Sequence, residues 1–274
     1  MTAAAMNLEQ ASPAPQLRDY VRCFQQRRAH ILGAAAAYPI AARPDQFLEF
    51  YLQDPYIVRL GDAAAPEIVP HSVVVGPCTQ LRAQLVLCGK LDVFTIQFRP
   101  AGFHRLFRMP MDEFANQAFE ARSVIGPKLG DFEQKLSCAS SFEERACVAS
   151  AFLIECLADR SGGDAVAAVA NRFLSERGAL GVGDAAAEAG LSVRQFERRF
   201  SEQVGVPPKL YARVVRFNAA LEAKMSAPRR LWTDIAHDFG YYDQMHMVRD
   251  FEDFTGENPT AFTRRLEAMP ESWA

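Results

Sequence analysis

The sequence IAHDFGYYDQMHMVRDFEDFTGENPTAF, residues 235–262, decides the fold of the carboxy-terminal half because its pattern occurs twice in the chain. An aromatic residue is followed by Gly five residues on, by Pro three further and by Arg five beyond. The first copy has Phe200, Gly205, Pro208 and Arg213, and the second has Phe251, Gly256, Pro259 and Arg264, with Tyr211 answered by Phe262. Such self-similarity indicates a duplicated structural unit.

The first copy predicts two short helices joined by a glycine turn. We expect a supporting helix over residues 182–189, a left-handed turn at Gly190 and a second helix capped by Ser192. This order is that of a helix-turn-helix, whose second helix lies in the major groove of DNA. Helical spacing predicts one buried face, made by Val193, Phe196 and Phe200. The opposite face carries Arg194, Glu197 and Arg198, and its two guanidinium groups suit guanine edges or phosphates.

The second copy predicts the same order of elements. Its supporting helix is expected over residues 234–239, its turn at Gly240, and its second helix from the cap Asp243 to about residue 254. The predicted buried residues are Met247, Phe251 and Phe254. The residues expected to face outward are Gln244, Met245, His246 and Arg249. Gln can bind adenine and Arg guanine, whereas Met offers only apolar contact, for instance to a thymine methyl group.

One long helix over residues 208–224 is expected to join the two units. About sixteen helical residues span roughly 24 Å, so the flanking helices can place the two reading helices about 34 Å apart, one turn of the duplex. Positive charge is concentrated here, because residues 190–230 hold nine Lys or Arg against three Asp or Glu while the chain has a net charge of −3. We infer that the first unit anchors the phosphates and the more acidic second unit tunes the contact.

These residues resemble the AraC/XylS family of bacterial transcription regulators over about residues 165–265. The matching residues of the second unit are Ile235, Ala236, Phe239, Gly240, Tyr241, Asp243, Gln244, Arg249, Asp250, Phe251, Phe254, Thr255, Gly256, Pro259 and Phe262. Those of the first unit are Leu191, Ser192, Phe196, Glu197, Arg198, Arg199 and Phe200.

The resemblance implies sequence-specific binding of double-stranded DNA by both reading helices. Carried over by position, the base-contact candidates are Arg194, Glu197, Arg198, Gln244, Met245 and Arg249, with His246 nearer the backbone. Glu197 stands where the family commonly has a neutral or basic residue, and it can either accept from cytosine or orient the two arginines. Contact with RNA polymerase is expected to change transcription of a nearby operon.

The amino-terminal half has a different pattern, with short apolar or alternating runs separated by turn residues. We expect strands at residues 47–52, 56–60, 72–75, 81–87 and 91–98, then helices at residues 103–107, 111–116, 130–137 and 142–159. The predicted class is therefore α+β. A barrel- or sandwich-like antiparallel domain over residues 1–160, with flanking helices, precedes an all-helical domain over residues 164–267, and residues 161–163 form the linker.

Residues 76–77 and 98–103 resemble the β-rich domain found in some members of the same family, which holds an effector or a dimer contact. A small-molecule effector of unknown identity, or a partner protein, is therefore expected inside the sheet. The apolar stripe of helix 142–159 fits either a homodimer contact or the core of one chain.

Motifs for catalysis, cofactors and metals are missing from the sequence. The six cysteines are dispersed with no C-x-x-C spacing, which favours reduced cytosolic thiols over a disulfide frame or a zinc site. The histidines of the amino-terminal half, His30, His71 and His104, are far apart, and no nucleophile elbow or phosphate loop occurs. We expect no enzyme, cofactor or metal, and, since no apolar run reaches the length of a membrane span, a cytoplasmic protein.

Two alternatives to a regulator are open. The carboxy-terminal half can be an ordinary helical bundle whose arginines are solvated surface charges, which requires the duplication and both glycine turns to be accidental. The chain can also be a sensor enzyme, modifying a small molecule or using a thiol for repair, fused to a DNA-binding tail. Bound metal and turnover would distinguish such an enzyme from a regulator.

Overall fold

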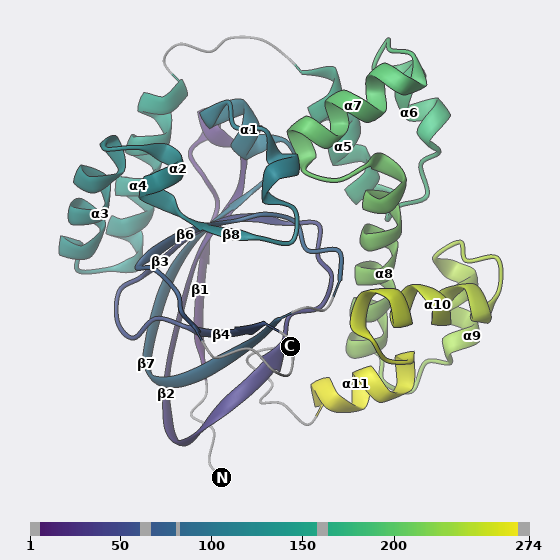
Figure 1. The fold of residues 1–274 in the computed structure, drawn as a ribbon, viewed down its shortest axis with the longest axis horizontal. Helices are drawn as coiled ribbons and strands as arrows, with labels where there is room; N and C mark the ends of the chain where they lie inside the picture. The colour runs from purple at the N-terminus through teal and green to yellow at the C-terminus, as the bar shows by residue number, and fades with distance from the viewer. Residues whose placement is uncertain (1–5, 61–66, 81–82, 158–163, 268–274) are drawn as a thin grey trace.

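The computed structural model describes residues 6–60, 67–80, 83–157 and 164–267 of the chain. A β-rich amino-terminal half lies beside a helical carboxy-terminal half, and this arrangement confirms the predicted α+β class (Figure 1). The predicted linker, residues 161–163, lies outside the described residues. The domain limits 1–160 and 164–267 therefore stay a prediction.

The described strands of the amino-terminal half form one antiparallel sheet. Strand order is β1-β2-β7-β3-β6-β8, and β4 pairs with both β7 and β5. The strands are β1 (Asn7–Ala11), β2 (Val21–Pro39), β3 (Gln46–Tyr51), β4 (Ile57–Leu60), β5 (Glu67–Ile68), β6 (Ser72–Val75), β7 (Ala83–Phe98) and β8 (Ala118–Glu120).

The longest strands differ from the prediction. Strand β7 is continuous, although the sequence predicts separate strands at residues 81–87 and 91–98. Gly89, with φ of +75°, keeps its pairing with Ile31 of β2, and the register shifts beside this pair, so the glycine marks an irregularity instead of a chain reversal. Strand β2 was not predicted at all, because polar Gln26 and Arg27 stand within it and are turned into the protein.

Helices cover one side of the sheet (Figure 1). They are α1 (Gly102–Phe107), α2 (Ala121–Ile125), α3 (Lys128–Cys138) and α4 (Phe142–Leu157), with 3-10 turns at Pro15–Leu17 and Met111–Phe114. Along α4, Ala149, Phe152 and Leu153 are buried in the core of this half. Phe152 stacks on Phe132 of α3 with ring centroids 4.3 Å apart. The predicted stripe of α4 is thus core within one chain, and the homodimer stays a prediction.

The carboxy-terminal half consists of seven helices within residues 164–267. They are α5 (Ala165–Ser175), α6 (Val182–Glu188), α7 (Val193–Val204), α8 (Pro208–Ser226), α9 (Trp232–Asp238), α10 (Gln244–Thr255) and α11 (Pro259–Glu267). The predicted joining helix is α8. It contributes residues to two hydrophobic cores, one in each unit. Tyr211 packs on Phe200 of the first unit at 5.4 Å, and Phe217 packs on Phe251 of the second at 4.7 Å.

The thiols and the possible metal ligands form no site in the described part of the chain. None of the six cysteines forms a disulfide bond, and no group of His, Cys, Asp and Glu within residues 6–60, 67–80, 83–157 and 164–267 is arranged to hold a metal ion. No described helix combines the length and apolar character needed to cross a bilayer.

Candidate nucleic-acid interface

Both reading helices, α7 and α10, begin at the predicted residues, where a glycine turn and a capping side chain precede each helix. Gly190 and Gly240 take nearly the same left-handed conformation, with φ of +66° and +68°, between the supporting and reading helices. The Ser192 side chain accepts from the Gln195 backbone N–H, and Gln195 returns the contact to form a capping box. In α10, Asp243 Oδ1 accepts from the backbone N–H of His246 at 2.7 Å. The duplication predicted from the sequence is thus present as two helix-turn-helix units.

Helix α7 presents its three predicted contact residues to solvent. Arg194, Glu197 and Arg198 are exposed, and Phe196 and Phe200 on the other side are completely buried. The expected burial of Val193 is wrong, because this residue is 46% exposed. It is the first residue of the helix, and the buried stripe is continued at the other end by Val204.

Helix α10 presents Gln244, Met245 and Arg249, and the burial of Met247, Phe251 and Phe254 is confirmed. His246 is only half-exposed. Its ring lies edge-on to the ring of Tyr241 at 5.4 Å, and its Nδ1 faces the Tyr242 backbone N–H at 3.4 Å. This imidazole therefore supports the first turn of α10 and reaches less far outward than its neighbours.

An ion-pair network that the sequence analysis missed ties α10 to α8. Asp250 is 1% exposed, and its Oδ1 accepts from Arg213 Nη2 at 2.7 Å and from Arg213 Nε at 3.0 Å. Arg213 also pairs with Asp253. Beside them, burial raises the pKa of Tyr241, and the Asp250 carboxylate raises it further. A signal was present in the repeat, since Asp250 stands where the first copy has Arg199.

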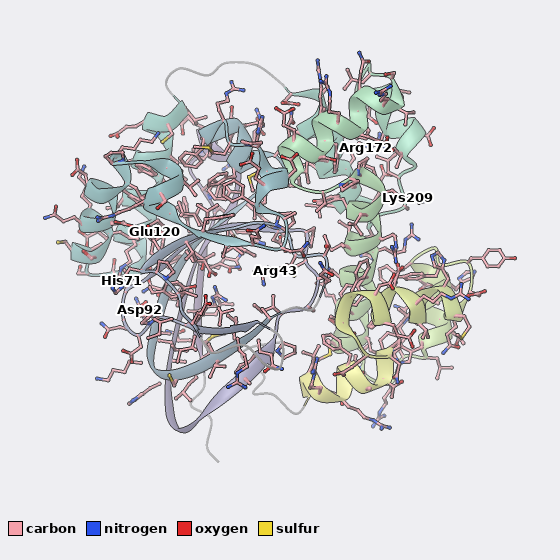
Figure 2. All side chains as sticks on the ribbon, in the orientation of Figure 1. Arg43, His71, Asp92, Glu120, Arg172 and Lys209 are labelled. Carbon is pink, nitrogen blue, oxygen red and sulfur yellow. The ribbon has the colours of Figure 1, made fainter. Side chains whose placement is uncertain are left out.

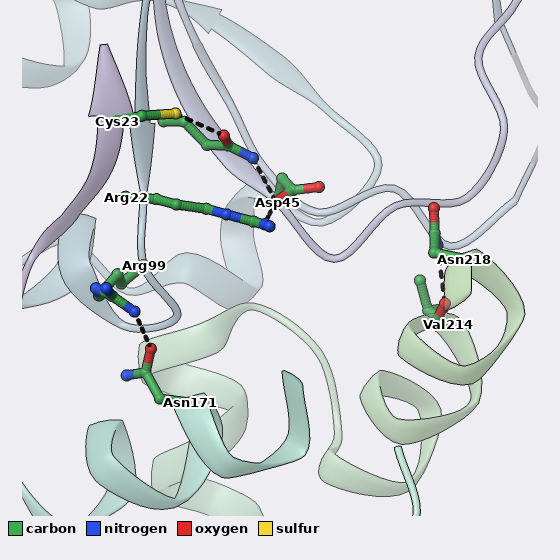
Figure 3. Close-up of polar contacts among 8 residues, drawn as sticks. Arg22, Cys23, Asp45, Arg99, Asn171, Val214 and Asn218 are labelled. Carbon is green, nitrogen blue, oxygen red and sulfur yellow. Dashed lines mark hydrogen bonds and ion pairs between the residues drawn. The ribbon is translucent and has the colours of Figure 1, made fainter. Parts of the chain in front are cut away.

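The amino-terminal half contacts both units away from the predicted contact residues. Gln46 Nε2 donates to the carbonyl oxygen of Val204, the last residue of α7, at 2.9 Å. Asn218 Nδ2 of α8 donates to the carbonyl oxygen of Ala42 at 3.0 Å. Arg99 Nη1 donates to Asn171 Oδ1 of α5 at 3.3 Å (Figure 3). The first unit is thus held at the end of its reading helix and at its supporting core.

A cavity of about 380 Å³ lies within the amino-terminal half. On its wall Arg27 pairs with Glu49 at 2.6 Å, and the Tyr51 hydroxyl donates to the same carboxylate at 3.0 Å. Tyr56, which is 2% exposed, lines the cavity with a hydroxyl that has no hydrogen-bond partner among the described residues, and burial raises its pKa to about 12. The cavity therefore combines apolar surface with neutral and charged polar groups that a small molecule can contact.

The segment over residues 40–47 belongs both to this cavity and to the contact with the helices. Ile40, Arg43 and Phe47 line the cavity. Between them, Ala42 packs in the core of the second unit, and Gln46 bonds the end of α7. Figure 2 shows Arg43 on the side of the sheet that faces the carboxy-terminal helices. A movement of this segment at the cavity wall would therefore also move residues that contact both units.

A family model described as a helix-turn-helix domain matches residues 185–265, and one described as a domain of unknown function matches residues 9–120. A search of curated proteins found no match.

The solved structures that this chain matches include ToxT of Vibrio cholerae. Its unsaturated-fatty-acid-bound form is 10% identical, covers 99% of this chain and 100% of its own, and has a TM-score of 0.49. ToxT bound to (E)-4-(8-methylnaphthalen-1-yl)but-3-enoic acid is 12% identical, with coverages of 97% and 100% and a TM-score of 0.49. The AraC-like transcriptional activator CuxR is 10% identical, with coverages of 98% and 88% and a TM-score of 0.24. The family match and the duplicated unit together show that residues 185–265 of this chain form a helix-turn-helix domain.

Proposed function

We propose that this chain is a DNA-binding transcription regulator of the AraC/XylS family, and that it reads two successive major-groove segments, one with α7 and the other with α10. The observation that carries the proposal is that six of the seven candidate residues are exposed on two helices that share α8 as their common support. Direct base contacts are assigned to Arg194, Glu197, Arg198, Gln244, Met245 and Arg249, and His246 is assigned to the sugar-phosphate backbone.

The two units contribute differently to affinity. Positive charge is concentrated in residues 190–230, which include the first reading helix and α8, and phosphate neutralisation dominates the affinity of proteins for DNA. Arg213 of α8 is engaged by Asp250 and Asp253 of the second unit, which leaves it little capacity to neutralise phosphate. The first unit therefore anchors the protein, and the second adjusts sequence preference. RNA polymerase is the proposed partner of the DNA-bound protein.

Selection from a random duplex library with the full-length protein tests this function. We expect enriched sites with two conserved segments about one helical turn, roughly 34 Å, apart. Mapping of bound sites across a genome would then identify the regulated genes. A protein that binds no duplex even at low salt would contradict the proposal, and enrichment of a single short segment would contradict the double readout.

Replacing Gln244 by Ala is expected to relax sequence preference at one base pair of the second segment. The amide can form two hydrogen bonds with adenine, worth about 1–3 kcal/mol of discrimination, but it neutralises no phosphate. The slope of affinity against salt should therefore stay unchanged. Selection with the variant and a salt titration measure both quantities. An equal loss of affinity on every sequence would mean that Gln244 makes no base contact.

We also propose that a small molecule occupies the cavity of the amino-terminal half and changes the placement of the helix-turn-helix units. The unpartnered Tyr56 hydroxyl and the exposed edge of the Arg27–Glu49 pair supply polar contacts, and the surrounding valines supply apolar ones. Residues 40–47 connect this cavity to both units. A ligand that favours one placement shifts the population toward it by its difference in affinity.

Replacing Gly205 by Ala tests the contact between the halves. Gly205 follows α7 with φ of +101°, and an added Cβ would lie 2.8 Å from Pro77 Cγ and 2.9 Å from the Met111 oxygen. Gly256 is the matched control, because it follows α10 with φ of +72° and has nothing within 4 Å of an added Cβ. Both variants should lose about 1 kcal/mol of stability from the left-handed backbone, and Gly205→Ala about 1–2 kcal/mol more from overpacking.

Thermal unfolding measures this difference, and DNA affinity measures its consequence. We expect only Gly205→Ala to change the DNA affinity of the full chain through the amino-terminal half. Equal stability and equal DNA affinity of the two variants would mean that the halves do not restrain each other.

A further inference from the structure

Tyr242 is the most exposed large hydrophobic residue in the part of the chain that the structure describes, with 93% of its surface accessible. It directly precedes Asp243, the cap of α10. In the first copy the corresponding residue is Leu191, which is partly buried against the core of its unit. An apolar residue at this position normally packs against the helix as a hydrophobic staple. The two copies of the repeat therefore differ at this position, because Leu191 is partly buried and Tyr242 is exposed.

The backbone around Tyr242 is fixed to the first turn of the reading helix. Its N–H lies 3.4 Å from His246 Nδ1, and the next residue, Asp243, accepts from the His246 backbone. Gln244 and Met245 follow at once, and Met245 is itself 58% exposed. In a helix-turn-helix the amino-terminal end of the second helix contacts base edges. Tyr242 consequently stands at the leading end of the surface that α10 presents to DNA.

The charge of the second unit favours an apolar contact there. Asp243, Glu252 and Asp253 are exposed on or beside α10, whereas Arg213 is held by two carboxylates. Phosphate neutralisation is thus a weak source of affinity for this unit. Besides the hydrogen bonds assigned to Gln244 and Arg249, the thymine methyl group can distinguish bases, because apolar side chains contact it in the major groove.

We propose that Tyr242 is a specificity-determining residue whose ring packs on a thymine methyl at the edge of the segment read by α10. The inference rests on the proposed double readout of DNA. It assigns to the second unit an apolar surface made by Tyr242 and Met245, in contrast to the arginine surface of the first unit.

The test uses the full-length protein and the duplex that it selects from a random library. Tyr242→Ser should lose the preference for thymine at one position, and Tyr242→Phe should keep it. Replacing that thymine by uracil, which lacks the methyl group, should weaken the wild type about fourfold, the value of one buried methyl. The same replacement should not affect Tyr242→Ser. Ile68→Ser, which removes a side chain 71% exposed on β5, is the control for lost exposed apolar surface.

The outcomes separate this inference from the proposed function. A wild type that selects no sequence contradicts the double readout itself. A wild type that selects a sequence, with a Tyr242→Ser variant that keeps every preference and the full effect of uracil, overturns only the role of Tyr242. The role of Tyr242 in DNA readout would also be overturned if Tyr242→Ser bound DNA like the wild type but supported less transcription by added RNA polymerase. The ring would then contact a protein. Equal melting temperatures confirm that the variants are folded.

Discussion

Replacing Arg198 by Glu is expected to weaken DNA binding more than any other single change on the reading surface. Loss of a bidentate contact to guanine costs about 1–3 kcal/mol, and a carboxylate placed against the duplex adds like-charge repulsion on the order of another 1–3 kcal/mol. The fold should not change, because Arg198 is exposed and lies opposite the buried Phe196 and Phe200.

Two neighbouring substitutions separate charge from readout. Arg199→Glu makes the same charge change on the same helix, and we expect it to lower affinity similarly for every sequence. Arg198→Ala removes the contact without repulsion, and we expect relaxed preference at one base pair of the first segment. Affinity measured over a salt series, with selection for each variant, distinguishes the two effects. If Arg198→Ala bound the selected duplex as tightly as the wild type at physiological salt, the proposed placement of α7 would be wrong.

The parts of the fold that sequence could predict are those fixed by neighbours in the chain. The glycine turns at Gly190 and Gly240 and the caps Ser192 and Asp243 depend on side chains within a few residues, so their spacing alone identified both units. Val193 marks the limit of such reasoning. It satisfies the helical period, yet at the first position of α7 it faces solvent.

The parts that sequence could not predict depend on distant contacts. The sequence did not predict strand β2, because Gln26 and Arg27 interrupt its apolar pattern. Their hydrogen-bond partners, Asp92 and Glu49, lie on other strands. The cavity beside that pair explains the polar residues, since a functional site is where local patterning fails. The stripe of α4 likewise could not be assigned until Phe132 of α3 was seen packed against it. The contact residues on α7 and α10 follow from their positions in the repeat, because exposure on a helix that begins at a predicted cap depends on neighbours in the chain.

Replacing Arg213 by Ala is expected to destabilise the second unit by about 3–5 kcal/mol, because it would leave the charge of Asp250 buried without a partner. Arg213 is one-third exposed, so the lower end of this range is the better expectation. The variant should also lose the preference attributed to Gln244 and Arg249, since α10 would no longer be fixed to α8, while the readout by α7 should persist. Thermal unfolding and duplex selection measure these two consequences.

A second substitution shows whether the buried charge is the cause. Asp250→Asn in the Arg213→Ala background removes the unpaired charge and should restore part of the lost stability, although Asp250→Asn alone should destabilise by weakening the pair. This sign reversal is the signature of coupled residues in a double-mutant cycle. Additive losses would show that Arg213 stabilises the unit mainly through its packing over Phe254, whose ring centroid lies 5.1 Å from the guanidinium carbon. Arg213 would then support α8 and α10 by its contact area, and the orientation of the second reading helix would depend on packing in the core that includes Phe217, Phe251 and Phe254.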